Sequence, residues 1–67
     1  MAKRTHQEMA QAINDLSRRQ FHVEQSGIEE MNLYWFKLST QDVLHFTPND
    51  SDKTLSQGLW NHGLLRT

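Results

Sequence analysis

Histidines are the residues of this chain best suited to acid–base chemistry, because imidazole exchanges protons near neutral pH. The four are His6, His22, His45 and His62. His22 and His45 fall in stretches that alternate apolar and polar residues, so we expect both on one face of a sheet. Such a pair could supply a general acid and a general base for RNA cleavage, with Lys37 as the nearby cation. The interpretation that we favour is that both imidazoles are ordinary surface groups, and we assign no catalytic residue.

The remaining polar residues form no recognisable metal or nucleophile motif. The sequence has no cysteine and no HxH or HExxH spacing, so we predict no disulfide, no metal site and no cofactor. Glu29 and Glu30 are adjacent in a predicted loop, where both carboxylates are expected to be solvated. Asp50 and Asp52 lie at the start of a predicted helix, where such residues act as caps.

Composition narrows the class of protein. The 67 residues fit one domain, residues 1–67, and seven Lys and Arg against eight Asp and Glu give a formal net charge of −1. A dedicated nucleic-acid binder usually has a basic excess, so nucleic acid is not the favoured partner. No apolar run is long enough to span a bilayer, and the first ten residues lack the apolar core of a secretory signal. We therefore expect a cytoplasmic protein.

A helix is predicted at each end of the chain. In the first, residues 4–19, Thr5 and Glu8 have capping-box spacing, and Arg18 and Arg19 are placed in the last turn. The second covers residues 51–63 and is closed by Gly63, a typical residue just beyond a helix end. Apolar residues recur at helical spacing in both and are expected to face the core; these are Met9, Ile13, Leu16, Leu55 and Leu59.

Three strands are predicted between the helices. Residues 20–25 alternate, residues 31–38 are rich in aromatic side chains, and residues 43–47 are followed by Pro48, which cannot donate to a ladder. Residues 26–30 contain a glycine and are expected to be a loop. Short connections imply an α+β fold, a two-layer α-β-β-β-α sandwich whose three-stranded antiparallel meander carries both helices on one face.

Lys37 determines which sheet residues face the helices. Its ammonium should face water, so Tyr34, Phe36 and Leu38 face the helices, and Leu33 and Trp35 lie with Lys37 on the other side. The inward residues of the neighbouring strands are then Phe21, Val23, Leu44 and Phe46. The surface predicted to bind a partner consists of Trp35, Leu33, Lys37, Val43, His45 and His22, with Glu24 beside them. A Trp among aliphatic residues on an open sheet favours a binding surface. The alternatives are that the chain ends or residues 26–30 fold over this face, or that the assignment of the two faces is inverted.

The second half of the chain resembles a known family. The segment "YWFKLSTQDVLHFTPNDSDKTLSQGLWNHGL" combines a strand containing "FKL", a strand ending in proline, a polar turn and a closing helix ending in "GL". These features resemble the HicA toxins, small mRNA interferases with a double-stranded-RNA-binding-like α-β-β-β-α fold. Asn32, Leu33 and Tyr34 stand where that family has a Gly-Ser-His cluster. Aligning "LHFTP" with that cluster instead makes His45 the catalytic histidine implied by the resemblance, and His22 is the other candidate.

Three functional hypotheses follow. The favoured one is a non-enzymatic binding protein, a regulator or inhibitor of the kind encoded by phages and other mobile elements, which docks its open sheet face on a protein. The alternative is a HicA-like RNA-binding protein or mRNA interferase. The third is a homodimer with a structural role, formed by self-association.

Overall fold

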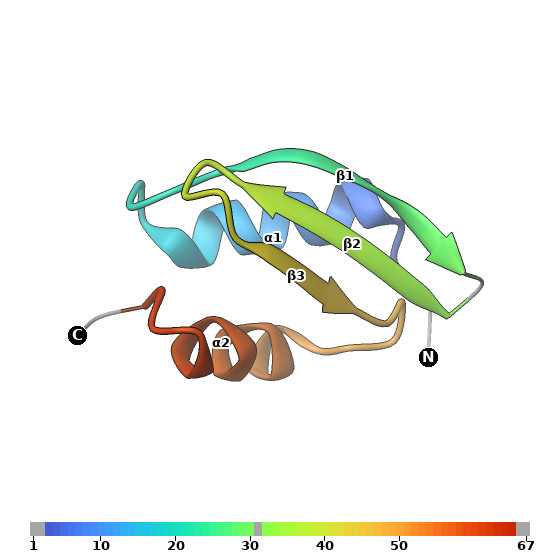
Figure 1. Cartoon of the computed structure of the whole chain (residues 1–67). Coiled ribbons are helices and arrows are strands. Elements are labelled where there is room, and N and C mark those ends of the chain that lie inside the picture. The colour runs from blue at the N-terminus through green and yellow to red at the C-terminus, as the bar shows by residue number, and fades with distance from the viewer. Residues whose placement is uncertain (1–2, 31, 66–67) are drawn as a thin grey trace.

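The chain forms one helix, three consecutive strands and a second helix, in the order that the sequence predicts. A computed structural model describes residues 3–30 and 32–65. The elements are α1 (His6–Ser17), β1 (Val23–Glu30), β2 (Leu33–Leu38), β3 (Val43–Phe46) and α2 (Asp52–Asn61). They form an α-β-β-β-α sandwich with an antiparallel sheet in the order β1-β2-β3, which confirms the predicted fold class (Figure 1). Met31, predicted to begin the second strand, lies outside the described residues.

Helix α1 begins at the predicted capping box. Thr5 Oγ1 accepts a hydrogen bond from the Glu8 amide at 3.1 Å, and Glu8 Oε1 accepts one from the Thr5 amide at 2.9 Å. The helix ends at Ser17, whose hydroxyl lies 2.7 Å from the carbonyl oxygens of both Asn14 and Phe21 and shares its one proton between them. A hydroxyl bridging helix and following chain favours this early end.

Because of this early end, the predicted position of two arginines is wrong. Arg18 and Arg19 follow the helix, with φ of 52° and 72°, instead of lying in its last turn. Both side chains are exposed, and both backbones occupy the left-handed region that is uncommon for residues other than glycine.

One core fills the space between the helices and the sheet. Tyr34, Phe36 and Leu38 are buried and alternate with half-buried neighbours along β2, as the orientation of Lys37 predicts. The buried apolar residues come from both helices and from the same sheet face, so both helices cover that face: Met9, Ile13, Phe21, Tyr34, Phe36, Leu38, Leu44, Phe46, Leu55 and Leu59. Leu16 and Val23, predicted as core residues, pack against this cluster and are partly buried.

Strand β1 is longer than predicted and begins later. The stretch of residues 26–30, predicted as a loop, belongs to β1, and the chain turns at Asn32. Gly27 lies opposite Trp35, and a Cβ added at Gly27 would lie 2.8 Å from three indole atoms. A glycine inside a strand often marks such a close approach, so it indicates packing here and not a loop. The ladder is irregular on both sides of this region, between Val23 and Gln25 and between Ile28 and Glu30.

Helix α2 is capped at both ends. Ser51 Oγ accepts a hydrogen bond from the Thr54 amide, and Gly63 follows the helix with φ of 72°. The Leu64 amide donates to the Leu59 carbonyl and the Gly63 amide to the Trp60 carbonyl, each at 2.9 Å, which is the Schellman pattern. The predicted role of Gly63 is therefore confirmed.

Arg4 connects the start of α1 with the loop before α2. Its guanidinium is 2.6 Å from the Asp52 carboxylate and also donates to the Asp50 carbonyl. Its carbonyl accepts a hydrogen bond from the Tyr34 hydroxyl at 2.8 Å. These contacts hold the two helix starts beside one end of β2. No helix in the described ranges is long and apolar enough to cross a membrane.

A candidate docking face on the sheet

The sheet face opposite the helices, which we call the outer face, carries no helix or strand from residues 3–30 and 32–65. In Figure 1 the sheet lies in front of α1, and its outer face is turned toward the viewer. The side chains at its centre come from adjacent positions of β2 and β3, and we call them the Trp35 stripe: Leu33, Trp35, Lys37, Val43 and His45. Leu33, Trp35 and Lys37 are half-buried, whereas Val43 and His45 are exposed. Five of the six residues predicted to bind a partner therefore lie together.

Cross-strand pairing brings the members of the stripe into contact range. Trp35 lies opposite His45, and Lys37 lies opposite Val43. In an antiparallel ladder, hydrogen-bonded residue pairs alternate with non-hydrogen-bonded pairs. The Leu38 amide donates to the Asp42 carbonyl at 2.9 Å, so Leu38 and Asp42 form a hydrogen-bonded pair. By that alternation, both pairs are of the non-hydrogen-bonded kind, in which opposite side chains approach most closely. The stripe is thus a continuous surface on a hydrogen-bonded sheet.

Trp35 is held in place from the β1 side. Its indole lies over Gly27, where the absence of a Cβ leaves room for the ring. This arrangement resembles the pairing in which an aromatic residue covers a glycine on a neighbouring edge strand. The indole is consequently half-buried by its own sheet, while the outer face above it carries neither helix (Figure 1).

The two histidines with predicted chemistry are not neighbours. The His22 carbonyl accepts from the Ser39 amide at 2.8 Å, so His22 lies beside the far end of β2, whereas His45 is opposite Trp35. Four residues of strand separate these positions, about 13 Å, and the two histidines lie on opposite sides of β2. The structure therefore places His22 apart from the Trp35 stripe.

Each of these histidines has a glutamate beside it instead. His45 Nε2 is 3.8 Å from Glu29 Oε2, and His22 Nε2 is 4.0 Å from Glu24 Oε2. His6 has a different environment, since its Nδ1 lies 2.8 Å from the Ser26 hydroxyl and its ring meets Tyr34 edge to face. His62 caps the end of α2. Within residues 3–30 and 32–65, no three His, Asp or Glu side chains are grouped so that they could hold a metal ion.

Negative charge lies along one side of the Trp35 stripe. Glu29 approaches His45, Glu30 pairs with Leu33, and Glu24 precedes the residue that pairs with Lys37. Lys37 is the cation within the stripe itself. The carboxylates of Glu29 and Glu30 outnumber this one ammonium, which gives this part of the surface a net negative charge.

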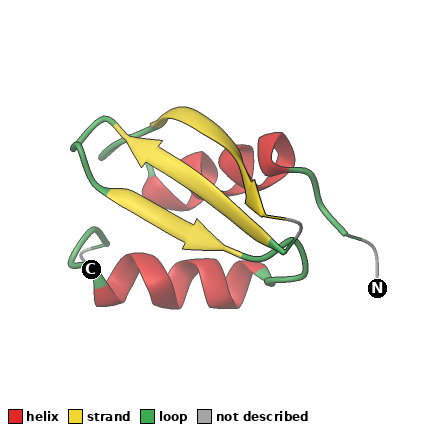
Figure 2. Ribbon diagram, turned by 45° about the vertical axis from the view of Figure 1, so that its right-hand side comes forward, coloured by secondary structure: helices red, strands yellow, loops and turns green. Residues whose placement is uncertain are grey.

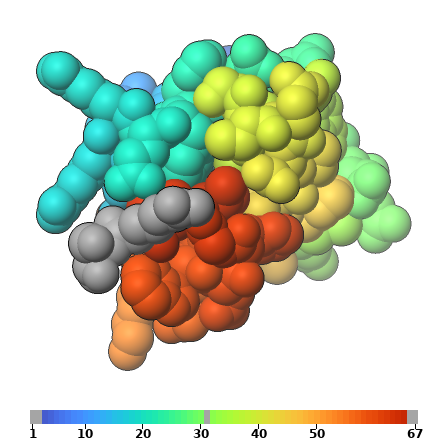
Figure 3. Space-filling model, turned by 60° about the vertical axis from the view of Figure 1, so that its left-hand side comes forward, coloured from blue at the N-terminus to red at the C-terminus, as the bar shows by residue number. Residues whose placement is uncertain are grey.

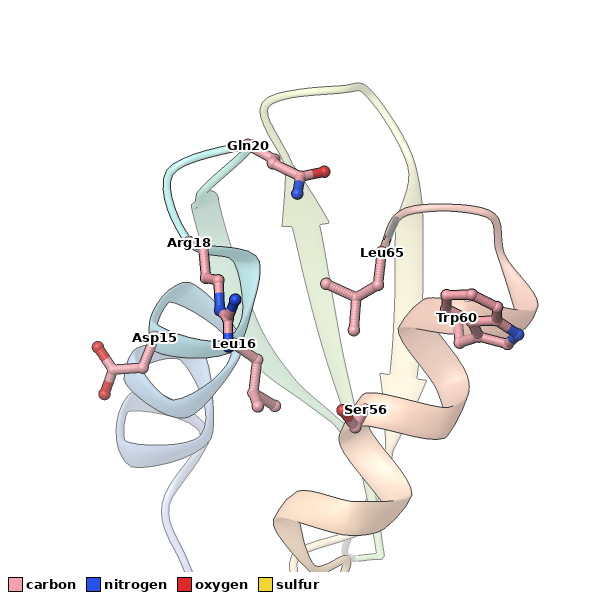
Figure 4. A pocket seen from close by; sticks show the side chains of 7 residues that line it. All are labelled: Asp15, Leu16, Arg18, Gln20, Ser56, Trp60 and Leu65. Atoms are coloured by element: carbon pink, nitrogen blue, oxygen red, sulfur yellow. The ribbon is translucent and has the colours of Figure 1, made fainter. Parts of the chain in front are cut away.

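A second surface, which the sequence patterns did not indicate, lies between the helices. A groove of about 440 Å³ is lined by Asp15, Leu16, Arg18, Gln20, Ser56, Trp60 and Leu65 (Figure 4). Trp60 is 51% exposed and lies on the α2 side of the groove. Its position directly after the core residue Leu59 was the available signal, because adjacent helix residues project about 100° apart and a side chain as large as Trp then extends past the core face. Figure 3 shows the end of the molecule where the α1–β1 connection, the β2–β3 turn and the end of α2 meet.

Comparison with known proteins adds no family. No protein-family model matches the sequence, and neither a curated protein nor a solved structure matches it. The resemblance to HicA toxins therefore stays a prediction.

Proposed function

We propose that this chain is a small non-enzymatic binding protein that docks the outer face of its sheet on a protein partner. The observation that carries the proposal is the Trp35 stripe, an apolar and aromatic surface that spans β2 and β3 on the face opposite both helices. Burying apolar surface contributes about 25 cal/mol per Å², so one Trp and two aliphatic side chains supply a few kcal/mol to binding. Trp is also among the residues most enriched at binding hot spots.

The charges beside the stripe indicate which surface charge a partner should have. Glu29 and Glu30 outnumber Lys37, so a partner surface with apolar residues and a basic rim is complementary. Complementary charge mainly accelerates association and selects the partner, while the apolar centre provides affinity. The outer face thus fits a basic protein surface better than it fits phosphate.

We place the protein in the cytoplasm as a regulator or inhibitor that acts by covering a surface of its partner, as small proteins of phages and mobile elements do. The absence of cysteine fits a reducing compartment. The stripe lies on a sheet that is preorganised by the core beneath it, which lowers the entropic cost of binding.

The HicA-like alternative has less support from the geometry. His22 and His45 lie apart, each beside a glutamate, and Arg4 is engaged with Asp52. Arg18 lines the groove between the helices, away from the outer face. Self-association through the Trp35 stripe is the other alternative. A molecular mass in solution that rises with protein concentration would reveal it.

The test compares two exposed aliphatic residues on opposite faces. Val43 and Ile28 are 48% and 59% exposed; Val43 belongs to the stripe, whereas Ile28 pairs with Tyr34, which is buried on the helix face. The tagged protein, with a photo-crosslinking residue at position 37, is used to capture and identify the partner by mass spectrometry. Val43→Glu is expected to weaken binding of the identified partner at least tenfold, and Ile28→Glu to leave it unchanged.

Three results would contradict the proposal. The first is equal binding by both variants. The second is RNA binding that weakens with added salt and is abolished by His45→Ala, which would favour the RNA alternative. The third is a mass that doubles with concentration and returns to that of a monomer in Val43→Glu, which would favour the homodimer.

A further inference from the structure

The sheet edge formed by β3 has backbone groups that make no hydrogen bond with the residues that the structure describes. Strand β3 pairs with β2 alone, and in Figures 1 and 2 it is the strand nearest α2, with no strand beyond it. The alternation fixed by the bond between Leu38 and Asp42 directs the backbone groups of Leu44 and Phe46 toward β2. Those of Val43 and His45 therefore point to the open edge. Among the described residues, no hydrogen bond engages the amide or carbonyl of either.

This open edge is short and ends at Thr47, whose backbone amide already donates a hydrogen bond. The Thr47 amide donates to Asp50 Oδ2 at 2.9 Å. Two amides and two carbonyls, from Val43 and His45, are consequently available, which is enough to fix the register of an added strand by four hydrogen bonds. An unpaired strand edge is a ready template for another chain.

A groove runs along α2 beside this edge. Its volume is about 350 Å³, and it is lined by Phe46, Lys53, Thr54, Gln57, Gly58 and Asn61. Gly58 allows the close packing at its base, since a Cβ there would lie 2.7 Å from the Phe46 ring. Lys53 is the charged residue of the lining, and within the described ranges no carboxylate lies within 4 Å of it.

We propose that an extended segment of a partner protein adds to the edge of β3 and inserts one side chain into this groove. The inference rests on the proposed function, because it specifies how that protein partner docks. Residues of the added strand that pair with Val43 and His45 would share their face and so widen the Trp35 stripe. The residues between them would point toward the helix layer and the groove, because successive side chains in a strand alternate.

The groove specifies the chemistry of the inserted residue. Phe46 and Gly58 favour an apolar side chain, and Lys53 favours an acidic residue near it on the side where α2 begins. Lys53 lies one residue after Asp52, the first residue of α2, and α2 begins on the side where β3 ends. Side chains of the expected segment thus point alternately toward the groove and toward the outer face. On the groove side it has one aliphatic or aromatic residue and, two positions away, an Asp or Glu.

A second copy of the chain fits this site less well. If two β3 edges paired, the side chains directed at the helix layer would be Leu44 and Phe46, which are 2% and 7% exposed in their own core. If β1 of a second copy paired with β3, its outward backbone groups would be those of Ser26 and Ile28, and Gly27 between them would offer the groove no side chain. Either arrangement leaves the groove empty.

The test uses peptides of known sequence. A random linear ten-residue library displayed on phage is selected against the full chain, and the best binder is synthesised. Methyl groups are then placed one at a time on its backbone amides. Methylation is expected to reduce affinity at least tenfold at alternate residues and to have little effect on those between, because only alternate amides face β3. Bound peptide should also slow hydrogen exchange at the amides of Val43 and His45.

Matched variants separate this inference from the proposed function. Gln57→Trp fills the groove from an exposed helix position and should abolish peptide binding, whereas Gln7→Trp, exposed on α1, should not. Leu33→Glu alters the stripe without touching the edge of β3. A partner that is lost with Leu33→Glu but retained with Gln57→Trp leaves the docking face standing and overturns strand addition. If neither Leu33→Glu nor Gln57→Trp weakens binding of the partner, both the docking face and strand addition are overturned. An empty selection, a peptide without alternating methylation effects, or unprotected amides at residues 43 and 45 would also overturn strand addition.

Discussion

The two faces of the sheet differ in what their side chains do, although they share the same three strands. On the helix face, Tyr34, Phe36, Leu38, Leu44 and Phe46 are at most 7% exposed. On the outer face, no residue of the Trp35 stripe is fully buried, and Trp35 rests on a glycine of its own sheet. The helix face therefore provides most of the folding free energy, and the outer face retains apolar surface that folding did not use.

The largest expected difference between the faces comes from truncating adjacent aromatic residues. Phe36→Ala should cost about 3–5 kcal/mol, because it removes a fully buried ring and leaves a cavity. That approaches the whole stability of a small domain, so most of the variant should be unfolded. Trp35→Ala should cost less, about 1–2 kcal/mol, since its ring is partly exposed and lies outside the core. Urea unfolding followed by circular dichroism measures both values. Equal losses would show that the outer face is a second core.

An intermediate loss of stability is expected where the Trp35 indole packs on Gly27. Gly27→Ala places a Cβ 2.8 Å from the Trp35 indole, so the ring must move, at a cost of about 1–3 kcal/mol. In a Trp35→Val background the same change should cost less than about 0.5 kcal/mol, because the clash is absent. The double-mutant cycle gives the coupling energy between the two positions. A coupling near zero would mean that the indole does not depend on this glycine.

The glycine also shows where sequence patterns were sufficient and where they failed. Alternation in residues 33–38, together with the charge of Lys37, was enough to assign both faces of β2, because the side-chain period of a strand is two. Residues 26–30 were misassigned because Ser-Gly and two glutamates are typical of loops. Their strand conformation depends on the contact between Gly27 and Trp35, eight residues later, which local propensity does not register.

The candidate site was predictable in its composition and less so in its geometry. The patterns placed Trp35, Val43 and His45 on one face correctly. They could not show that His22 lies beside the end of β2, away from the Trp35 stripe, because its position depends on the register between β1 and β2. They also missed the open backbone edge of β3, since every residue has an amide and a carbonyl and only the pairing shows which remain free.

The smallest expected effect is the most informative about the outer face. Val43→Thr exchanges a methyl group for a hydroxyl at a side chain that is 48% exposed and keeps β-branching, so stability should change by less than about 0.5 kcal/mol. Leu44→Thr, one residue later on the buried face, should cost about 2–4 kcal/mol, because it removes apolar volume from the core and buries a hydroxyl. Both are measured by thermal unfolding at two protein concentrations a hundredfold apart. If Val43→Thr proves costly at the higher concentration alone, the stripe is covered by a second copy, because stability gained from association rises with concentration. If it is neutral at both, Val43 contributes little to folding, and its apolar surface is left for a partner.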